Sequence, residues 1–314
     1  MMEKVTKATR ESFGETITKL AETNPDIVVL DADLAEATKT VIFKKKFPKR
    51  FIDCGIAECN MISMAAGLST CGKIPFAASF AMFSAGRAFE QVRNSVGYPQ
   101  LNVKIIGSHA GISVGEDGAT HQCSEDIALM RAIPGMVVLN PGDHYEMQAA
   151  VQAAAAYRGP VYIRLGRLAV ESVNNGEDYH FEMGKGITMQ EGTDITLIAT
   201  GLMVSEAVKA AAVLSAEGVS LRLINIHTIK PLDEALILKA AKETGRIVTV
   251  EEHSVIGGLG EAVASLVSEK CPVPVKKIGV NDVFGHSGPA KELLQAFGLS
   301  AENIVKVVKE QLQA

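Results

Sequence analysis

Gly-Ser-His-Ala-Gly-Ile-Ser-Val-Gly-Glu-Asp-Gly-Ala-Thr-His-Gln forms residues 107–122 and follows directly on residues 103–106, which are apolar except for Lys104 and predict a buried strand. The stretch is a glycine-punctuated polar loop. It contains two histidines and two carboxylates: His109, His121, Glu116 and Asp117. Titratable side chains at the carboxyl end of a buried strand are typical of a small-molecule site in an α/β protein. The same composition would also suit a flexible surface loop, so the rest of the chain has to decide.

Helical and strand patterns alternate on both sides of this loop. Short apolar runs are separated by stretches with helical spacing, which implies crossover connections and mainly parallel sheets. The alternation breaks at residues 171–192, where glycine and asparagine are frequent. We therefore predict two successive α/β domains, residues 1–170 and 193–314, joined by a linker at 171–192.

Composition excludes several classes of function. The 314 residues are 47% hydrophobic and carry 31 basic against 36 acidic side chains, with no basic face that would suit nucleic acid. Five cysteines without a C-x-x-C pair are typical of reduced thiols. The sequence has neither a secretory signal nor an apolar run of membrane-spanning length. We expect a cytoplasmic protein with no nucleic-acid or membrane partner.

Glu58 is the most conspicuous single residue. It lies in the almost wholly apolar run 55–67, which predicts a helix. A carboxyl removed from water can retain or share a proton near neutral pH, as functional carboxyls do. Alternatively, Glu58 is a first-turn partner of the helix dipole. Its position alone favours this second interpretation.

Two further sets of side chains are weaker candidates. Phe80 and Phe83 stand where a predicted strand passes into a helix, and either a platform for a flat heterocycle or an ordinary core would use them. Arg10, Arg164 and Arg167 carry guanidinium groups, whose fixed donors suit phosphate or carboxylate.

Other familiar motifs do not apply. Residues 111–118 lack the Gly-Lys-Ser/Thr of a phosphate-binding loop. Residues 257–260 lack the G-x-G-x-x-G spacing and predict a tight entry into a helix. Neither metal-ligand spacing of Cys and His nor a G-x-S-x-G elbow occurs, so we predict no metal site in this chain.

Taken together, three segments match one family. Residues 55–61, 79–83 and 108–121 occur in this order and spacing in transketolases, and residues 226–233 and 250–253 agree as well. Over nearly its whole length the chain resembles the C-terminal half of this thiamine-diphosphate family. The resemblance implies a pyrimidine-binding domain followed by the transketolase C-terminal domain.

The resemblance implies a cofactor site around Glu58. This carboxyl matches the glutamate that hydrogen-bonds the aminopyrimidine ring of thiamine diphosphate and favours its imino tautomer. Phe80 and Phe83 match the aromatic pocket that packs on that ring, and Asp33 matches an acidic residue near the cofactor. The family aromatic one turn beyond Phe83 is replaced here by Gly86 or Arg87.

The resemblance also implies a substrate site. His109, Asp117 and His121 match the loop that orients the carbonyl and hydroxyls of the sugar, and His109 and His121 join Glu58 as implied catalytic residues. Arg10 and Arg167 match the arginines that bind the phosphate of the substrate. A phosphate-binding serine of many transketolases aligns with Ala37, so we predict Thr38, the next residue, as its substitute.

One departure from the family concerns the missing half of the site. The Gly-Asp-Gly…Asn motif that binds diphosphate through Mg²⁺ does not occur in this sequence. We therefore expect a separate N-terminal subunit that holds most of the Mg²⁺ site, in an α₂β₂ assembly active only when complete.

The expected reaction moves a two-carbon ketol unit from a ketose phosphate to an aldose phosphate. Within the same cofactor class, the alternatives are a chain like 1-deoxyxylulose-5-phosphate synthase or like the β-subunit of a 2-oxoacid dehydrogenase. Those β-subunits do not share the loop at residues 115–121. A non-catalytic assembly protein with the same fold is the alternative from another class.

Overall fold

The first unit of the fold is built on a mainly parallel sheet. The computed structural model describes residues 5–174, 176 and 179–313. Strands of this sheet are β2 (Ile27–Asp31), β3 (Phe51–Asp53), β4 (Ile74–Phe80), β5 (Lys104–Ser108), β6 (Val137–Leu139), β7 (Val161–Arg164) and β12 (Thr228–Lys230). They lie in the order β12-β6-β7-β5-β4-β2-β3, and all pair in parallel except β12, which is antiparallel to β6. The carboxyl ends of the parallel strands therefore meet at one edge, as a ligand site requires.

Helices cover both faces of this sheet. On one face lie α1 (Thr9–Thr23), α3 (Val41–Lys46) and α7 (His144–Ala156), whose apolar side chains form one core cluster with the strands. On the other face lie α4 (Glu58–Thr70), the helical stretch 82–97 and α6 (Asp126–Ala132). Asp143 caps α7 by accepting a hydrogen bond from the Glu146 amide. The short α2 (Ala35–Thr38) and a 3₁₀ turn (Pro48–Arg50) complete the unit.

The stretch 82–97 is less regular than a single α-helix. Wide π-type turns, η2 (Met82–Arg87) and η3 (Val92–Gly97), flank the short α5 (Phe89–Gln91). The Ala88 amide accordingly donates to the Phe83 carbonyl, five residues earlier. Such turns are rare and often occur at functional sites, because they re-aim side chains. Arg87 is the last residue of the first of these turns.

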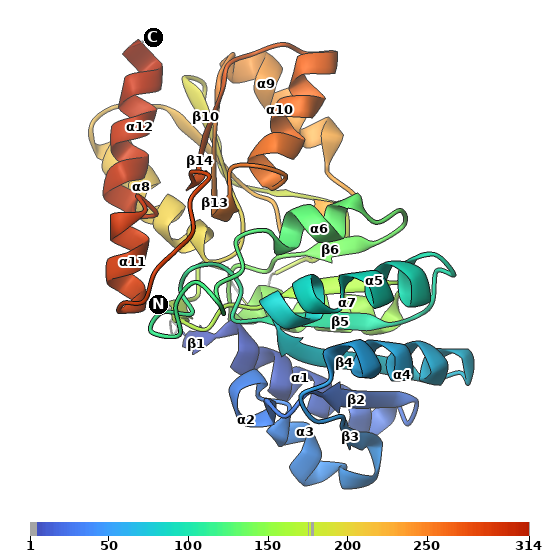
Figure 1. The fold of residues 1–314 in the computed structure, drawn as a ribbon. Helices are drawn as coiled ribbons and strands as arrows, with labels where there is room; N and C mark the ends of the chain where they lie inside the picture. The colour runs from blue at the N-terminus through green and yellow to red at the C-terminus, as the bar shows by residue number, and fades with distance from the viewer. Residues whose placement is uncertain (1–4, 175, 177–178, 314) are drawn as a thin grey trace.

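The second unit has its own sheet. Its strands are β9 (Ile187–Gln190), β10 (Ile195–Ala199), β11 (Leu221–Asn225), β13 (Ile247–Ser254) and β14 (Val275–Val280), in the order β14-β13-β10-β11-β9. Only β9 is antiparallel among these described strands. Helices α8 (Met203–Ala216) and α12 (Ala301–Gln313) cover one face, and α9 (Glu234–Thr244) and α10 (Leu259–Lys270) cover the other (Figure 1). The short α11 (Ala290–Ala296) precedes α12. The two units confirm the predicted α/β architecture.

Part of the predicted linker is ordered into sheets. β8 (Ala169–Glu171) pairs with β1 (Thr6–Ala8), and β9 extends the second sheet. The prediction of a linker across 171–192 missed β9, because the surrounding glycines obscured its four-residue strand signal. Residues 175, 177 and 178 of that linker lie outside the described residues.

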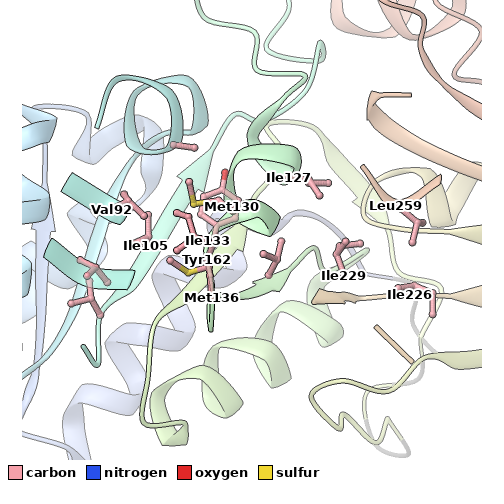
Figure 2. Close-up of a cluster of buried hydrophobic side chains, with 14 of the residues drawn as sticks. Val92, Ile105, Ile127, Met130, Ile133, Met136, Tyr162, Ile226, Ile229 and Leu259 are labelled. Atoms are coloured by element: carbon pink, nitrogen blue, oxygen red, sulfur yellow. The ribbon is translucent and has the colours of Figure 1, made fainter. Parts of the chain in front are cut away.

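One apolar cluster joins the units. It runs from Ile105 and Met130 in the first unit to Ile226 and Leu259 in the second, and Figure 2 shows these side chains spread from Ile105 on the left to Leu259 on the right. Burial of such a continuous surface stabilises a fixed arrangement of the units. In the described part of the chain, no helix combines the length and apolarity needed to cross a membrane.

Candidate active site

Glu58 lies at the start of α4 with its side chain only 2% exposed. Its Oε2 accepts a hydrogen bond from Arg87 Nη1 at 2.8 Å. The Arg87 side chain is 48% exposed, and its guanidinium lies over the Phe83 ring, 4.6 Å from the centroid. Glu58 is thus both a first-turn helix residue and a buried carboxylate. A single half-exposed side chain supplies its charged partner.

An aromatic wall stands beside this pair. The rings of Phe80, at the end of β4, and Phe83 are nearly parallel, with centroids 5.9 Å apart. His109 stacks on Phe80 at 4.0 Å, and His121 meets the edge of Phe83 at 5.3 Å. The structure therefore brings together residues from β4, η2 and the loop 107–122. A flat heteroaromatic ring is the kind of ligand that such a wall accepts.

A cavity of about 530 Å³ opens next to the aromatic wall. Phe83, Arg87 and Thr120 line it from the first unit, and Phe284 and Gly285 line it from the second. This size is typical of small-molecule sites. The second unit therefore contributes to the candidate site, a contribution that the sequence analysis did not predict.

His109 is held as a neutral imidazole. Its Nε2 lies 3.4 Å from Arg10 Nη1 and its Nδ1 lies 2.9 Å from Ser108 Oγ. Because a guanidinium only donates, Nε2 is the acceptor and Nδ1 carries the proton. Burial, and then the positive charges of Arg10, Arg167 and Lys39, lower the pKa of His109 to about 3. His109 can therefore orient a polar substrate, and at neutral pH it takes up no second proton.

Two arginines concentrate positive charge near His109. Arg10 donates from Nη1 to the Ala37 carbonyl at 2.8 Å, while its buried Nε has no hydrogen-bond partner among the described residues. Arg167 pairs with Glu116 at 2.7 Å and also donates to the Val114 carbonyl. A buried donor without a partner is costly, and an incoming anion would supply one.

The predicted role of Thr38 is wrong. Its buried hydroxyl donates to Asp31 Oδ2 at 2.7 Å, and the Thr40 hydroxyl donates to the same oxygen at 2.8 Å. Burial raises the pKa of Asp31 to about 6. Thr38 is thus engaged in fixing the turn after β2 and does not replace the phosphate-binding serine.

Two other predicted residues lie outside the aromatic cluster. Asp33 is exposed, has a positive φ of 61°, and lines a separate hollow of about 550 Å³ together with Asp53 and Lys44. Asp117 is exposed at the tip of the loop. Among the described residues, no group of His, Cys, Asp and Glu is arranged to bind a metal ion.

Arg87 is the site residue whose role sequence reasoning missed. The sequence shows the departure at Gly86-Arg87, but the pairing of Arg87 with Glu58 joins positions 29 residues apart. The available signal was the positive charge at a position where the family has an aromatic ring.

Two family models define the class of this protein. Residues 5–172 match the transketolase pyrimidine-binding domain, and residues 184–304 match the transketolase C-terminal domain. The fold is thus that of the pyrimidine-binding and C-terminal domains of the transketolase family, a family of thiamine-diphosphate-dependent transferases.

Individual relatives narrow the class. The chain is 50% identical to the putative transketolase C-terminal section of Methanocaldococcus jannaschii, over 98% of both chains. It is 44% identical to a 6-deoxy-6-sulfo-D-fructose transketolase subunit of a Clostridium species, over 96% of this chain and 93% of that one. A solved structure described as a split-gene transketolase, inactive β4 tetramer, superimposes with a TM-score of 0.91 at 52% identity, covering 98% of this chain and 99% of that one. The chain belongs to the transketolase family, among the C-terminal subunits of split transketolases, which confirms the resemblance inferred from the sequence.

Proposed function

We propose that this chain, joined to a separate N-terminal subunit, transfers a two-carbon ketol unit from a ketose phosphate to an aldose phosphate. Thiamine diphosphate would bind across the two subunits, with its Mg²⁺ held mainly by the partner, in an α₂β₂ assembly in the cytoplasm. The observation that carries the proposal is the buried Glu58 carboxylate beside the stacked Phe80 and Phe83 rings.

The residues present fit the aminopyrimidine end of the cofactor. Glu58 would hydrogen-bond a ring nitrogen of the aminopyrimidine and exchange a proton with that nitrogen. The ring would then replace Arg87 as the hydrogen-bond partner of the carboxylate. Phe80 and Phe83 would orient the ring and exclude water. When bound, thiamine diphosphate supplies the carbon nucleophile of the reaction.

The positive cluster supports an anionic sugar as substrate. The unmatched Arg10 donor, together with Arg167, would bind the anion, and neutral His109 would hydrogen-bond the sugar. The name of the Clostridium relative specifies a sulfo-sugar, whose sulfonate is, like a phosphate, an anion with tetrahedrally arranged oxygens. A phosphorylated and a sulfonated ketose therefore both belong in the first substrate panel.

The proposal predicts that the isolated chain is inactive, because the diphosphate site lies on the partner. Co-expression with the N-terminal subunit should give ketol transfer from xylulose 5-phosphate to ribose 5-phosphate that requires both thiamine diphosphate and Mg²⁺. Calorimetry should detect tight cofactor binding by the mixture and not by either subunit alone. Substantial turnover by the isolated chain would refute the requirement for a partner.

A further inference from the structure

The loop 107–122 is held from outside by the second unit. Within the loop, backbone hydrogen bonds close short turns, such as Gly118 to Gly115 and His121 to Gly118. At its base, Gly111 and Cys123 exchange two backbone hydrogen bonds. Such turns do not fix how the loop is placed against Phe80 and Phe83, so its position depends on its further contacts.

Glu252 makes the central contact. This residue of β13 extends its carboxylate from the second unit and accepts a hydrogen bond from the Ser113 amide at 2.7 Å. Gly111 leaves the room it needs, because a Cβ there would lie 2.3 Å from Glu252 Oε1. Glu252 is almost fully buried, so this hydrogen bond is shielded from water.

Glu252 is itself anchored to the first unit. Arg164 donates from Nη2 to the Glu252 carbonyl and from Nε to Asp126, both at 2.8 Å. Ser254, two residues further along β13, donates a hydrogen bond from its amide to the Ser124 carbonyl at 2.7 Å. The end of β13 is therefore fixed against Ser113 within the loop and against Ser124 just after it, so its movement would move the loop.

We propose that Glu252 is a positioning residue that holds the backbone of the loop, so that His109 and His121 face the substrate. For its kinetic part, this inference rests on the proposed ketol transfer. The C-terminal domain then has a role in the reaction, because it fixes the position of the loop 107–122. A displacement of even about 1 Å at such a loop is enough to slow a reaction severely.

Two substitutions separate reach from charge. Glu252→Asp keeps the charge but withdraws the carboxylate from the Ser113 amide, whereas Glu252→Gln keeps an acceptor of the same length. In the complete two-subunit enzyme, Glu252→Asp should raise KM for the ketose phosphate about tenfold and leave thiamine diphosphate affinity within about twofold of the wild-type value. Glu252→Gln should have a KM much closer to that of the wild-type enzyme.

The matched control is Glu251→Asp. Glu251 precedes Glu252 in β13, is equally buried, and accepts hydrogen bonds from the Leu259 and Gly260 amides at 2.7 and 2.8 Å, away from the loop. This change should lower thermal stability without altering KM. Equal kinetic effects of the two Asp variants, or a Gln variant as impaired as the Asp variant, would overturn the positioning role.

Hydrogen exchange tests the same inference without turnover. In the isolated chain, Glu252→Asp should speed amide exchange across residues 109–122 at least about tenfold, whereas Glu251→Asp should speed exchange at the start of α10 instead. If the wild-type complex transfers no ketol unit, the proposed function fails but the exchange result still decides whether Glu252 holds the loop. Unchanged exchange at 109–122 in a folded Glu252→Asp chain would refute it.

Discussion

Each unit of the molecule has a buried glutamate beside the first residues of a helix, and the two carboxylates are satisfied differently. Glu58, at the start of α4, pairs with the half-exposed side chain of Arg87. Glu251 accepts hydrogen bonds from two backbone amides at the start of α10. A side-chain partner can rotate away and release its carboxylate to a ligand, whereas backbone partners cannot. The same helix-terminus electrostatics thus gives a binding group in one unit and a structural brace in the other.

The glycines around α10 belong to this brace. A Cβ at Gly258 would lie 2.1 Å from Glu251 Oε2, so the glycine makes room for the protein's own carboxylate. Residues 257–260 therefore form a tight helix entry, as the sequence analysis predicted. Glycine-rich helix starts often bind anions, and here the carboxylate of Glu251 occupies the place that such an anion would take.

The largest expected effect is that of removing the carboxylate of Glu58, which separates its role from that of Glu251. In the two-subunit complex, Glu58→Gln should lower kcat about 10³-fold, because an amide cannot exchange the proton at the cofactor ring. Glu251→Gln, the matched change in the second unit, should reduce thermal stability and leave kcat near the wild-type value. Steady-state ketol transfer and thermal unfolding measure both. A near-normal rate for Glu58→Gln would remove Glu58 from the mechanism.

A smaller effect is expected for the arginines. Arg10→Ala should raise KM for a phosphorylated ketose about 10- to 100-fold, the value of one lost charged hydrogen bond, while KM for hydroxypyruvate changes little. Arg167→Ala should act in the same direction but also loosen the loop, since Arg167 binds Glu116 and the Val114 carbonyl. Arg131→Ala is the control, because that guanidinium donates to the Gly257 and Gly258 carbonyls in the second unit. Equal losses with both substrates would exclude a phosphate role for Arg10.

The smallest effect concerns pH. Because the pKa of His109 is lowered to about 3, its NMR signal should not titrate between about pH 5 and pH 8, and His109→Gln identifies that signal. Below its usual pKa of 6.5, the unfolded chain takes up a proton that the folded chain excludes, so His109 costs stability as the pH falls toward 3. His109→Gln should therefore reduce the loss of thermal stability on acidification. A signal that titrates near pH 6.5 would contradict the neutral, buried imidazole.

Sequence reasoning succeeded where the signal was local. The buried strands have apolar runs long enough to read directly, and Glu58 was detectable as an isolated charge in an apolar helix. The family motifs supplied the link between Glu58, the phenylalanines and the loop.

It failed where the partner is distant in the chain. Nothing near Arg87 indicates that it pairs with Glu58, and nothing near Glu252 indicates that it holds Ser113, because each contact depends on how separate elements pack. Thr38 was assigned from its neighbour in an alignment, although its hydroxyl faces inward toward Asp31. The helix α6, with seven residues, is too short to show a clear helical period.

The position of strand β12 has a consequence for how the chain folds during its synthesis. It comes from the second half of the chain, yet it pairs antiparallel with β6 at the border of the first sheet. Unpaired strand edges recruit other chains and promote aggregation. A fragment ending at residue 170 would expose the edge of β6. A nascent chain therefore has to be synthesised past Lys230 before β12 can pair with the exposed edge of β6.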